Sequence, residues 1–351
     1  MSYDLSIDIG TSYTAAAIRD SNGNTEPFRL GRTSNFVPSM VYLTEDGVFE
    51  IGDVAKRKAA TDPRAAATRL TRRIGDSTPI ILRSSPFSAE QLYARTLENV
   101  HAKVVEHMGE EPRRVVAVHP HAWGPYKIDL FGQALRMSNL STTTITAPIA
   151  AAWTYVTRKD LAAGSRVAMF DLGGGTLDIA VVEKTPDGFE MLGQGGGAEQ
   201  LGGIDIDSAI IDWVRGEVGE AWPAPSDDPR LAASLMQLED SCSEAKEILS
   251  SEPDVLIPVH FPDVDRMLTL TTEHLDQITL PIIDSAIDAL GDAFSNAEVS
   301  GAEVTTVLLG GCSRIPAIRT QIAERFGSRV AANIDPTHAV AFGAALSSGA
   351  A

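Results

Sequence analysis

Two short glycine-containing runs constrain this chain more than any other feature. They are Asp8-Ile-Gly-Thr-Ser-Tyr13 and Asp171-Leu-Gly-Gly-Gly-Thr-Leu-Asp178, and each places a carboxylate, glycine and hydroxyl residues in the same order. Apolar stretches flank both runs and predict strands at 3–9, 14–18, 165–170 and 179–182. Glycine turns the chain tightly and lets backbone N–H groups approach an anion, because no Cβ stands in the way. Each run therefore predicts a β-hairpin whose turn is suited to a phosphate.

Neither run fits the better-known glycine-rich phosphate motifs. A P-loop needs Gly-Lys followed by Ser or Thr at the start of a helix, and a dinucleotide fingerprint also leads into a helix. A single glycine-rich hairpin is more often a tight turn without a ligand, but two matched copies favour a shared ligand. Facing each other across a cleft, Asp8 and Asp171 could hold a hydrated magnesium ion. The loop amides and hydroxyls would then cradle a polyphosphate, through Thr11, Ser12 and Thr176.

Length and charge narrow the class of protein. With 351 residues, 44% of them hydrophobic, the chain is long enough for two domains, each with its own core. The 29 basic and 47 acidic residues give a formal charge of -18, which argues against a nucleic-acid or anionic-membrane surface. Cys242 and Cys312 lack the spacing of a zinc site or a disulfide framework. No run of about 18 apolar residues predicts a membrane span, so we expect a cytoplasmic protein that binds neither nucleic acid nor membrane.

Strands and helices alternate along the whole chain. Residues 113–119 and 304–309 predict buried strands, and residues 88–108 predict a long amphipathic helix that begins with Ser88 and Gln91 at capping-box spacing. The pattern after each glycine run repeats at a spacing of about 160 residues. We therefore expect an α/β fold made of two duplicated lobes around a cleft.

The expected boundaries follow from this repeat and from a polar stretch at 159–164. Lobe I should span residues 1–161, with an outer part at about 35–112, and residues 335–351 should complete it by packing a final helix back on it. Lobe II should span 162–334, with an outer part at about 203–285.

Further motifs point to one family. The two glycine runs, Leu201-Gly-Gly-Ile-Asp205 and Leu309-Gly-Gly-Cys-Ser-Arg-Ile-Pro316, in this order, resemble the nucleotide-binding domain of the 70-kDa heat-shock chaperone (DnaK-type) family. Residues 147–155 and 335–345 add to the resemblance, which covers essentially the whole chain. It implies an actin-like ATPase fold, with ATP or ADP and Mg²⁺ held between two lobes that each have an inner and an outer subdomain.

The resemblance also implies roles for particular residues. It places the metal beside Asp8 and Asp171. It implies that catalysis and the attacking water depend on Thr11, Asp171, Thr176 and Asp178. It implies that the nucleotide phosphates contact Gly10, Thr11, Ser12, Tyr13, Gly173, Gly174, Gly175 and Thr176. It places the turn near the phosphates and sugar at Gly202 and Gly203, and the adenosine pocket at Gly310, Gly311 and Arg314.

The adenosine pocket has an independent basis in the residues. Glycines after a strand bring the backbone close to a ring, and the Arg314 guanidinium offers a planar cation that can stack on a purine. A run of polar residues lies at three- and four-residue spacings and shares one helix face that could meet the ribose and base, namely Ser243, Lys246, Glu247 and Ser250. The competing interpretation is a solvated polar face.

Several departures from the family pattern put turnover in doubt. A lysine that points at the transferred phosphate is replaced by Thr71, and only Arg69, Arg72 or Arg73 could bring a nearby cation. Ala147 stands where the family has a glutamate that contacts the metal through a water molecule. Loss of one such electrostatic contact costs about 3 kcal/mol of transition-state stabilisation. On the adenosine helix, Ser243 and Glu247 replace a glutamate and an arginine.

The leading hypothesis is an ATP-binding domain of a DnaK-type chaperone-like protein that hydrolyses ATP slowly and signals by closing its cleft. A pseudo-ATPase that acts through protein contacts is the alternative, and a small-metabolite kinase is a third. The partner beyond ATP would be a substrate or effector module, attached C-terminally or separate, because no peptide-binding domain of the family lies within the 351 residues.

Overall fold

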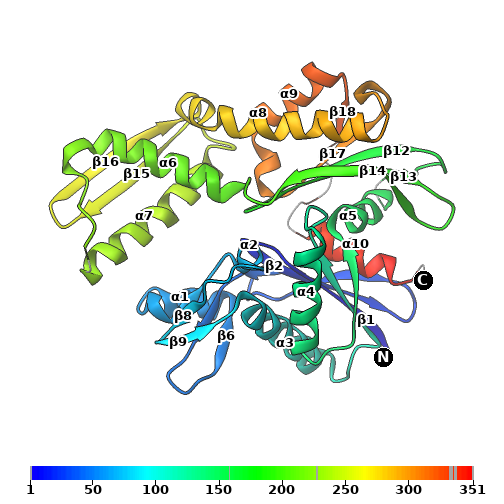
Figure 1. The fold of residues 1–351 in the computed structure, drawn as a ribbon, viewed down its shortest axis with the longest axis horizontal. Coiled ribbons are helices and arrows are strands. Elements are labelled where there is room, and N and C mark those ends of the chain that lie inside the picture. Colours follow the sequence, from blue (N-terminus) through cyan, green and yellow to red (C-terminus); the bar gives the residue numbers. More distant parts are fainter. Residues whose placement is uncertain (1, 158, 227, 332–334, 336–337, 350–351) are drawn as a thin grey trace.

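The chain forms two lobes that face each other, each built on its own β-sheet (Figure 1). A computed structural model describes residues 2–157, 159–226, 228–331, 335 and 338–349. In Figure 1 the lower lobe, drawn from blue to teal-green, holds the N-terminal half of the chain, and the upper lobe, drawn mainly in green, yellow and orange, holds most of the C-terminal half. The last helix, drawn in red, lies against the lower lobe. We call them lobe I and lobe II.

The two central sheets repeat one strand order. In lobe I the order is β11-β10-β1-β2-β3, and in lobe II it is β18-β17-β12-β13-β14. In both sheets the first three strands in the chain pair antiparallel as hairpins, and the last two pair parallel. The lobe I strands are β1 (Tyr3–Ile9), β2 (Tyr13–Asp20), β3 (Thr25–Phe28), β10 (Arg114–His119) and β11 (Thr142–Thr146), with β4 (Phe36–Pro38) on the edge of β2. The lobe II strands are β12 (Arg166–Leu172), β13 (Leu177–Lys184), β14 (Phe189–Ala198), β17 (Thr305–Leu309) and β18 (Arg329–Ala331). The duplicated α/β architecture predicted from the glycine runs is confirmed.

The remaining helices and strands of lobe I pack around its central sheet and form the outer part of the lobe. Its other strands are β5 (Val41–Leu43), β6 (Phe49–Ile51), β7 (Ala66–Ala67), β8 (Ile80–Leu82) and β9 (Ser85–Phe87). Its helices are α1 (Gly52–Ala59), α2 (Leu70–Arg73), α3 (Ala89–Met108) and α4 (Pro125–Met137). Helix α3 begins at the predicted capping box, in which the Gln91 amide donates to the Ser88 hydroxyl at 3.2 Å and the Ser88 amide donates to the Gln91 side chain at 2.9 Å.

Lobe II has the same plan with longer helices. These are α6 (Gly203–Val218), α7 (Pro229–Ile248), α8 (Thr272–Asn296) and α9 (Pro316–Phe326), with the hairpin β15 (Asp254–Phe261) and β16 (Val264–Thr271) at the outer end. One buried apolar cluster runs from the inner sheet through α6 and α8 to this hairpin. It makes lobe II a continuous body from the cleft to its tip.

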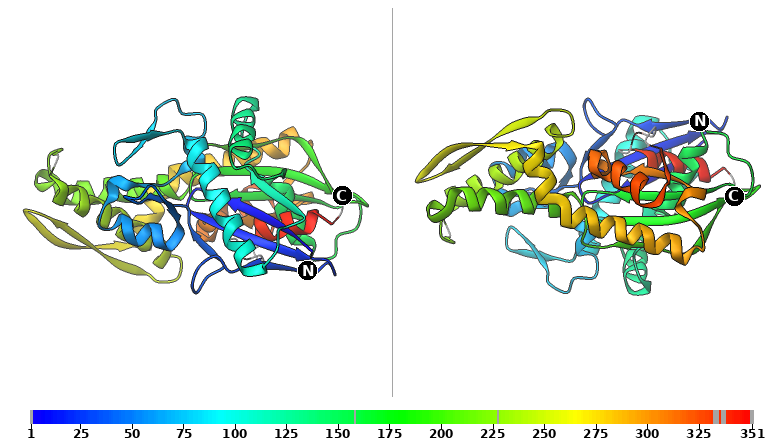
Figure 2. Two further views of the ribbon diagram at one scale, coloured as in Figure 1. Left: turned by 90° about the horizontal axis from the view of Figure 1, so that it is seen from below. Right: turned by 90° about the horizontal axis from the view of Figure 1, so that it is seen from above.

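Helices α5 (Ala147–Val156) and α10 (Ala339–Ser347) cross between the two sheets and are rich in small residues. A Cβ on Gly343 would lie 1.7 Å from the carbonyl oxygen of Ala150, so only glycine permits this crossing. The Thr154 hydroxyl also donates to the carbonyl of Ala339. In both views of Figure 2 the N- and C-terminal segments lie toward the same end of the molecule.

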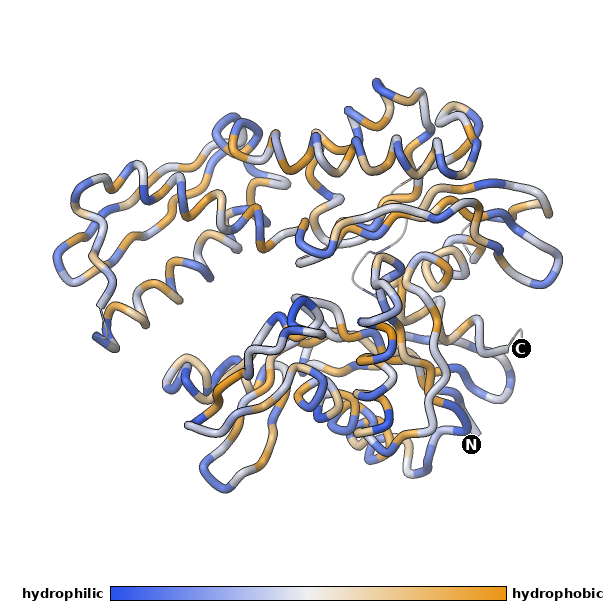
Figure 3. Tube along the Cα trace, viewed as in Figure 1, coloured by the Kyte–Doolittle hydropathy of each residue, from blue (hydrophilic) through white to orange (hydrophobic). Residues whose placement is uncertain are grey.

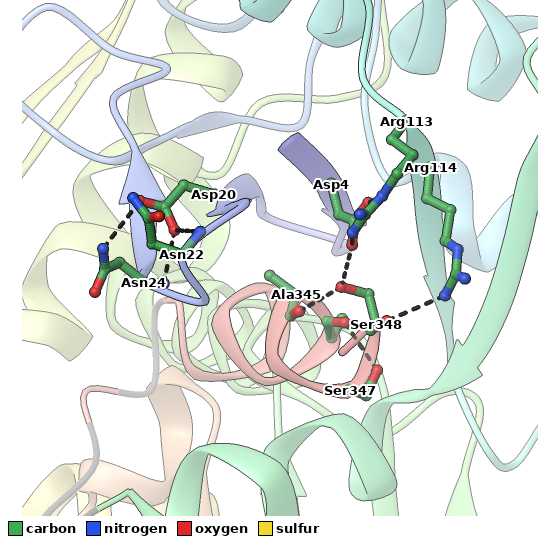
Figure 4. Close-up of polar contacts among 10 residues, drawn as sticks. Asp4, Asp20, Asn22, Asn24, Arg113, Arg114, Ala345, Ser347 and Ser348 are labelled. Carbon is green, nitrogen blue, oxygen red and sulfur yellow. Dashed lines mark hydrogen bonds and ion pairs between the residues drawn. The ribbon is translucent and has the colours of Figure 1, made fainter. Parts of the chain in front are cut away.

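The C-terminal helix is attached to lobe I by polar bonds as well as by packing. The Ser6 hydroxyl donates to the carbonyl of Ala341 at 2.6 Å. At the end of α10, the buried Asp4 carboxylate accepts from the Ser348 hydroxyl at 2.9 Å and from Arg113 at 2.7 and 2.8 Å (Figure 4). Burial alone would raise the pKa of Asp4, but the hydrogen bonds from Arg113 and Ser348 and the charges of Arg113 and Arg114 outweigh it and hold the pKa below its usual value.

Hydropathy follows the layers of the fold. Apolar residues, orange in Figure 3, run along the strands of both sheets and along the helices between them, whereas hydrophilic residues gather in the outer loops. Among the described residues, none of the helices is long and apolar enough to cross a membrane.

We predict that Asp4→Asn destabilises the protein at neutral pH by about 2 kcal/mol, since a buried, charge-assisted hydrogen-bond network loses its anion. The folded-state pKa of Asp4 is depressed, so its contribution is complete above the unfolded pKa of about 3.9 and disappears as the pH falls through the folded-state pKa. The difference in unfolding midpoint between wild type and variant should therefore be full at pH 7 and shrink in acid. Asp20→Asn, in an exposed turn, is the control and should shift the midpoint less; equal shifts for both variants would contradict this assignment.

Candidate functional site

Two hairpin turns meet between the lobes. The first loop, residues 10–13, joins β1 to β2, and the second loop, residues 173–176, joins β12 to β13. The same bond closes each of them: the Gly10 amide donates to the Tyr13 carbonyl at 3.0 Å, and the Gly173 amide donates to the Thr176 carbonyl at 3.0 Å. The two loops are thus equivalent in geometry as well as in sequence.

The loops approach so closely that side chains are excluded between them. A Cβ on Gly174 would lie 2.0 Å from the hydroxyl oxygen of Ser12, and a Cβ on Gly175 would lie 2.6 Å from the hydroxyl oxygen of Thr11. Any side chain at these two glycines would push the lobes apart. The glycines therefore set the distance between the lobes.

A cavity of about 370 Å³ lies at this meeting point. Most residues predicted from the sequence line it: Asp8, Gly10, Thr11, Ser12, Tyr13, Asp171, Gly173, Gly174, Thr176, Asp178, Ser243, Lys246, Glu247, Ser250, Gly310, Gly311 and Arg314. Gly175, Gly202 and Gly203 do not line it. Gly202 and Gly203 lie behind the second loop, where the Gly203 amide donates to the Gly173 carbonyl at 3.0 Å.

Three aspartates gather at the inner end of the cavity. Asp171 and Asp178 stand opposite each other in the β12–β13 register, and Asp8 occupies the equivalent position to Asp171 on β1. Burial raises the pKa of Asp8 to about 7, of Asp171 to about 8 and of Asp178 to about 6. Repulsion from Asp178 adds to the rise for Asp8 and Asp171, whereas the Ala122 amide, which donates to Asp178 at 2.9 Å, opposes the rise for Asp178.

This donor set suits a cation that keeps most of its water, because a cation beside Asp8 and Asp171 would relieve their repulsion. The described residues contain no cluster of three or more His, Cys, Asp or Glu side chains that could ligate a metal ion directly. Hydrated Mg²⁺, which takes one or two carboxylates plus phosphate oxygens, is compatible with that arrangement.

The opposite end of the cavity carries the polar face of α7. Ser243, Lys246 and Glu247 of α7 line it, as the spacing predicts for one helix face, and so does Ser250, which lies in the turn just after the helix ends at Ile248. Lys246 bonds to α6 within lobe II: its Nζ lies 2.7 Å from the Asp207 carboxylate and donates to the Gly203 carbonyl at 3.1 Å. Across from α7, Gly310 has φ +74°, and a Cβ there would lie 2.3 Å from the Leu172 carbonyl oxygen. The turn after β17 therefore requires glycine at this position.

Comparisons with known proteins agree with this geometry. The sequence profile described as "Hsp70 protein" matches residues 80–350. The chain belongs to the Hsp70 family. Curated relatives named "Chaperone protein DnaK" are 30% identical in Elusimicrobium minutum (strain Pei191), 28% in Nitrosopumilus maritimus (strain SCM1) and 27% in Endomicrobium trichonymphae. These alignments cover 97–98% of the chain but only 56–57% of each relative, so the chain spans about half the length of the DnaK proteins and corresponds to the nucleotide-binding domain.

Two positions at which the resemblance implies a departure from the Hsp70 pattern lie in the wall of the cavity. Thr71 and Ala147 both line it, and the Thr71 hydroxyl is buried against that of Thr11 at 2.7 Å. None of the three neighbouring arginines lines the cavity. Arg69 lies 3.8 Å from Glu239, Arg73 lies 2.7 Å from Asp76, and Arg72 bonds to Gly175 and Asp205. No guanidinium of this segment therefore lines the cavity beside Thr71.

The floor of the cavity was not predicted from the sequence. Tyr93 of α3, His119 at the end of β10 and Trp123 line it, and all three rings pack around Phe131. The indole N–H of Trp123 is buried and has no hydrogen-bond partner, and burial lowers the pKa of His119. One signal was available: β10 is parallel to β1, and the carboxyl ends of such strands commonly form the ligand crevice.

We predict that Gly310→Ala disrupts this site, whereas Gly311→Ala does not. At Gly310 the new Cβ meets the backbone of Leu172 and the φ of +74° is strained for alanine, while at Gly311 nothing lies within 4 Å. The expected cost at Gly310 is about 2–3 kcal/mol, so the thermal unfolding midpoint should fall by several degrees, with little change for Gly311→Ala. Equal midpoints for the two variants would contradict the geometry of this turn.

Proposed function

We propose that this chain binds Mg-ATP between its lobes, hydrolyses it slowly and transmits the state of the nucleotide through closure of the cleft. The observation that carries the proposal is the pair of equivalent loops, residues 10–13 and 173–176, that meet at one cavity with carboxylates at its inner end. Family membership supports it, because the chain corresponds to the nucleotide-binding half of DnaK-type proteins.

In this proposal the backbone N–H groups and hydroxyls of the two loops hold the phosphates. Turns with consecutive N–H groups form anion-binding concavities, and glycine lets the phosphate oxygens approach. Thr11, Ser12 and Thr176 add hydroxyl donors in the cavity wall. The nucleoside would extend toward α7 and Arg314, whose guanidinium can stack on the base.

The aspartates would supply the chemistry at the inner end. Asp8 and Asp171 would hold a hydrated Mg²⁺, which would neutralise charge on the phosphates when bound. Asp171 and Asp178 are paired across β12 and β13 and line the cavity with Thr176. Together these three residues would orient a water toward the terminal phosphorus and accept its proton. Their pKa values, raised to about 8 and about 6, lie in the range in which a carboxylate exchanges protons near neutral pH.

Two contacts argue for slow turnover. Thr71 is engaged with Thr11 where the family places a lysine, and the neighbouring guanidiniums bond elsewhere. The terminal phosphate would thus lack one preorganised cation, a loss of about 3 kcal/mol or roughly a hundredfold in rate. The same observation favours the second candidate function, a pseudo-ATPase that binds nucleotide and works through contacts with other proteins.

We predict that Asp171→Ala abolishes single-turnover hydrolysis of labelled ATP, and that Thr71→Lys raises the rate at least tenfold by restoring a cation beside the developing charge. Calorimetry should show that the wild type binds ATP. A wild-type rate equal to that of Asp171→Ala, with binding retained, would reject the ATPase and support the pseudo-ATPase. A wild type that binds no nucleotide would reject both.

A further inference from the structure

Helix α2 touches both loops with two consecutive residues. Thr71 bonds to Thr11 of the first loop, within lobe I, while the Nε of Arg72 donates to the Gly175 carbonyl of the second loop at 2.7 Å, across the cleft. This four-residue helix, Leu70–Arg73, is therefore a bridge between the loops.

The remaining donors of Arg72 are also directed to lobe II. One terminal nitrogen donates to Asp205 Oδ1 at 3.2 Å and the other bonds to Asp205 Oδ2, which gives a bidentate pair. The Asp205 carboxylate additionally accepts from the Gly202 amide at 2.8 Å. Arg72 is thus bonded both to the start of α6 and to the second loop.

The start of α6, to which Arg72 bonds, is itself hydrogen-bonded to the second loop. The amides of Gly203 and Ile204 donate to the carbonyls of Gly173 and Gly174 at 3.0 and 2.8 Å. A displacement of Arg72 is therefore passed directly to the backbone of the second loop.

Among the described ion pairs between the lobes, Arg72–Asp205 and Lys127–Glu199 are the less exposed; in the second pair the atoms lie 2.8 Å apart, and the side chains are 19% and 38% exposed. The side chain of Arg72 is 15% exposed and that of Asp205 is 31% exposed. Lys56–Asp240, at 3.6 Å, and Arg69–Glu239, at 3.8 Å, join side chains that are each 46–66% exposed. Exposed pairs of that kind contribute little, whereas a partly buried bidentate arginine contact is stronger and geometrically specific.

We propose that Arg72 is a positioning residue: its contacts with Gly175 and Asp205 hold the second loop against the first and keep the cleft closed. Arg72 does not line the cavity, so it acts through the second loop and touches no ligand. Opening of the cleft breaks its three contacts with lobe II together, and the second loop then loses its support. The consequence for nucleotide release rests on the proposed function, while the effect on cleft closure does not.

The first test measures release of a fluorescent ADP analogue by stopped flow. Arg72→Ala should accelerate release at least tenfold. Arg72→Lys keeps the charge but not the bidentate contact, so its effect should be intermediate. The control variant Arg69→Ala should release the analogue within twofold of the wild-type rate. Asp205→Asn keeps an acceptor for the Gly202 amide, and the double variant with Arg72→Ala should release no faster than Arg72→Ala alone. Additive effects in the double variant, or equal rates for Arg72→Ala and Arg69→Ala, would overturn the proposal.

The second test needs no nucleotide. Spin labels on Arg57→Cys of α1 and Ala233→Cys of α7, both exposed, report the width of the cleft by pulsed electron resonance, while the native Cys242 and Cys312 are buried. Arg72→Ala, and to a smaller extent Arg72→Lys, should shift the distances to longer values, and Arg69→Ala should not. Unchanged distances in both Arg72 variants would overturn the proposal, whereas absent nucleotide binding with shifted distances would overturn only the proposed function.

Discussion

The close approach of two glycine turns is the constraint on which the rest of the structure depends. Because Gly174 and Gly175 have no side chains, Ser12 and Thr11 can lie directly against the second loop. This contact brings equivalent strand ends of the two lobes to one place and forces Asp8, Asp171 and Asp178 into a shared, poorly solvated space. The raised pKa values of the three aspartates are therefore a consequence of how closely the backbones meet.

The two ends of the interface between the lobes are held in different ways. At one end α5 and α10 cross at Gly343 and Ala150 with no space for a side chain, and small buried residues fill the contact. Near the outer helices the lobes are joined by two exposed ion pairs and by Arg72. Close packing resists displacement more than exposed charges do. The crossing of α5 and α10 is therefore the natural pivot, and the cleft mouth is where the lobes can separate.

Sequence reasoning succeeded where the signal was local. Hairpins flanked by apolar strands, the Ser88 capping box and the polar face of α7 each depend on residues a few positions apart, and the structure contains all of them. It was limited where partners are distant in the chain. The resemblance implied that Thr71 stands where the family has a lysine. It gave no sign that Arg72 would bond to Gly175 and Asp205, since those partners are 103 and 133 residues away. Contacts of this kind depend on how two lobes are placed, and no local pattern encodes that placement.

The aromatic floor of the cavity illustrates the same limit at a shorter range. Tyr93 belongs to α3, which the sequence predicts as an amphipathic helix. Its ring contacts Phe131, yet the residue also lines the cavity. Whether the ring of a buried aromatic residue packs only in the core or also lines a cavity depends on which strand end lies beside it in the fold.

The distribution of fixed charge in the cavity gives the site its chemical character. Among the described residues that line it, the lysine and arginine side chains are Lys246 and Arg314, both at the end where α7 lies, and Lys246 is already paired with Asp207. The inner end holds carboxylates, with no lysine or arginine in its lining. Under the proposed function, phosphates there would be recognised by backbone N–H groups and hydroxyls, together with a cation that is not part of the protein. Such a site would hold phosphate by shape and dipoles, but it would supply little fixed positive charge as negative charge develops in the transition state. This is the physical reason to expect binding to be better preserved than turnover.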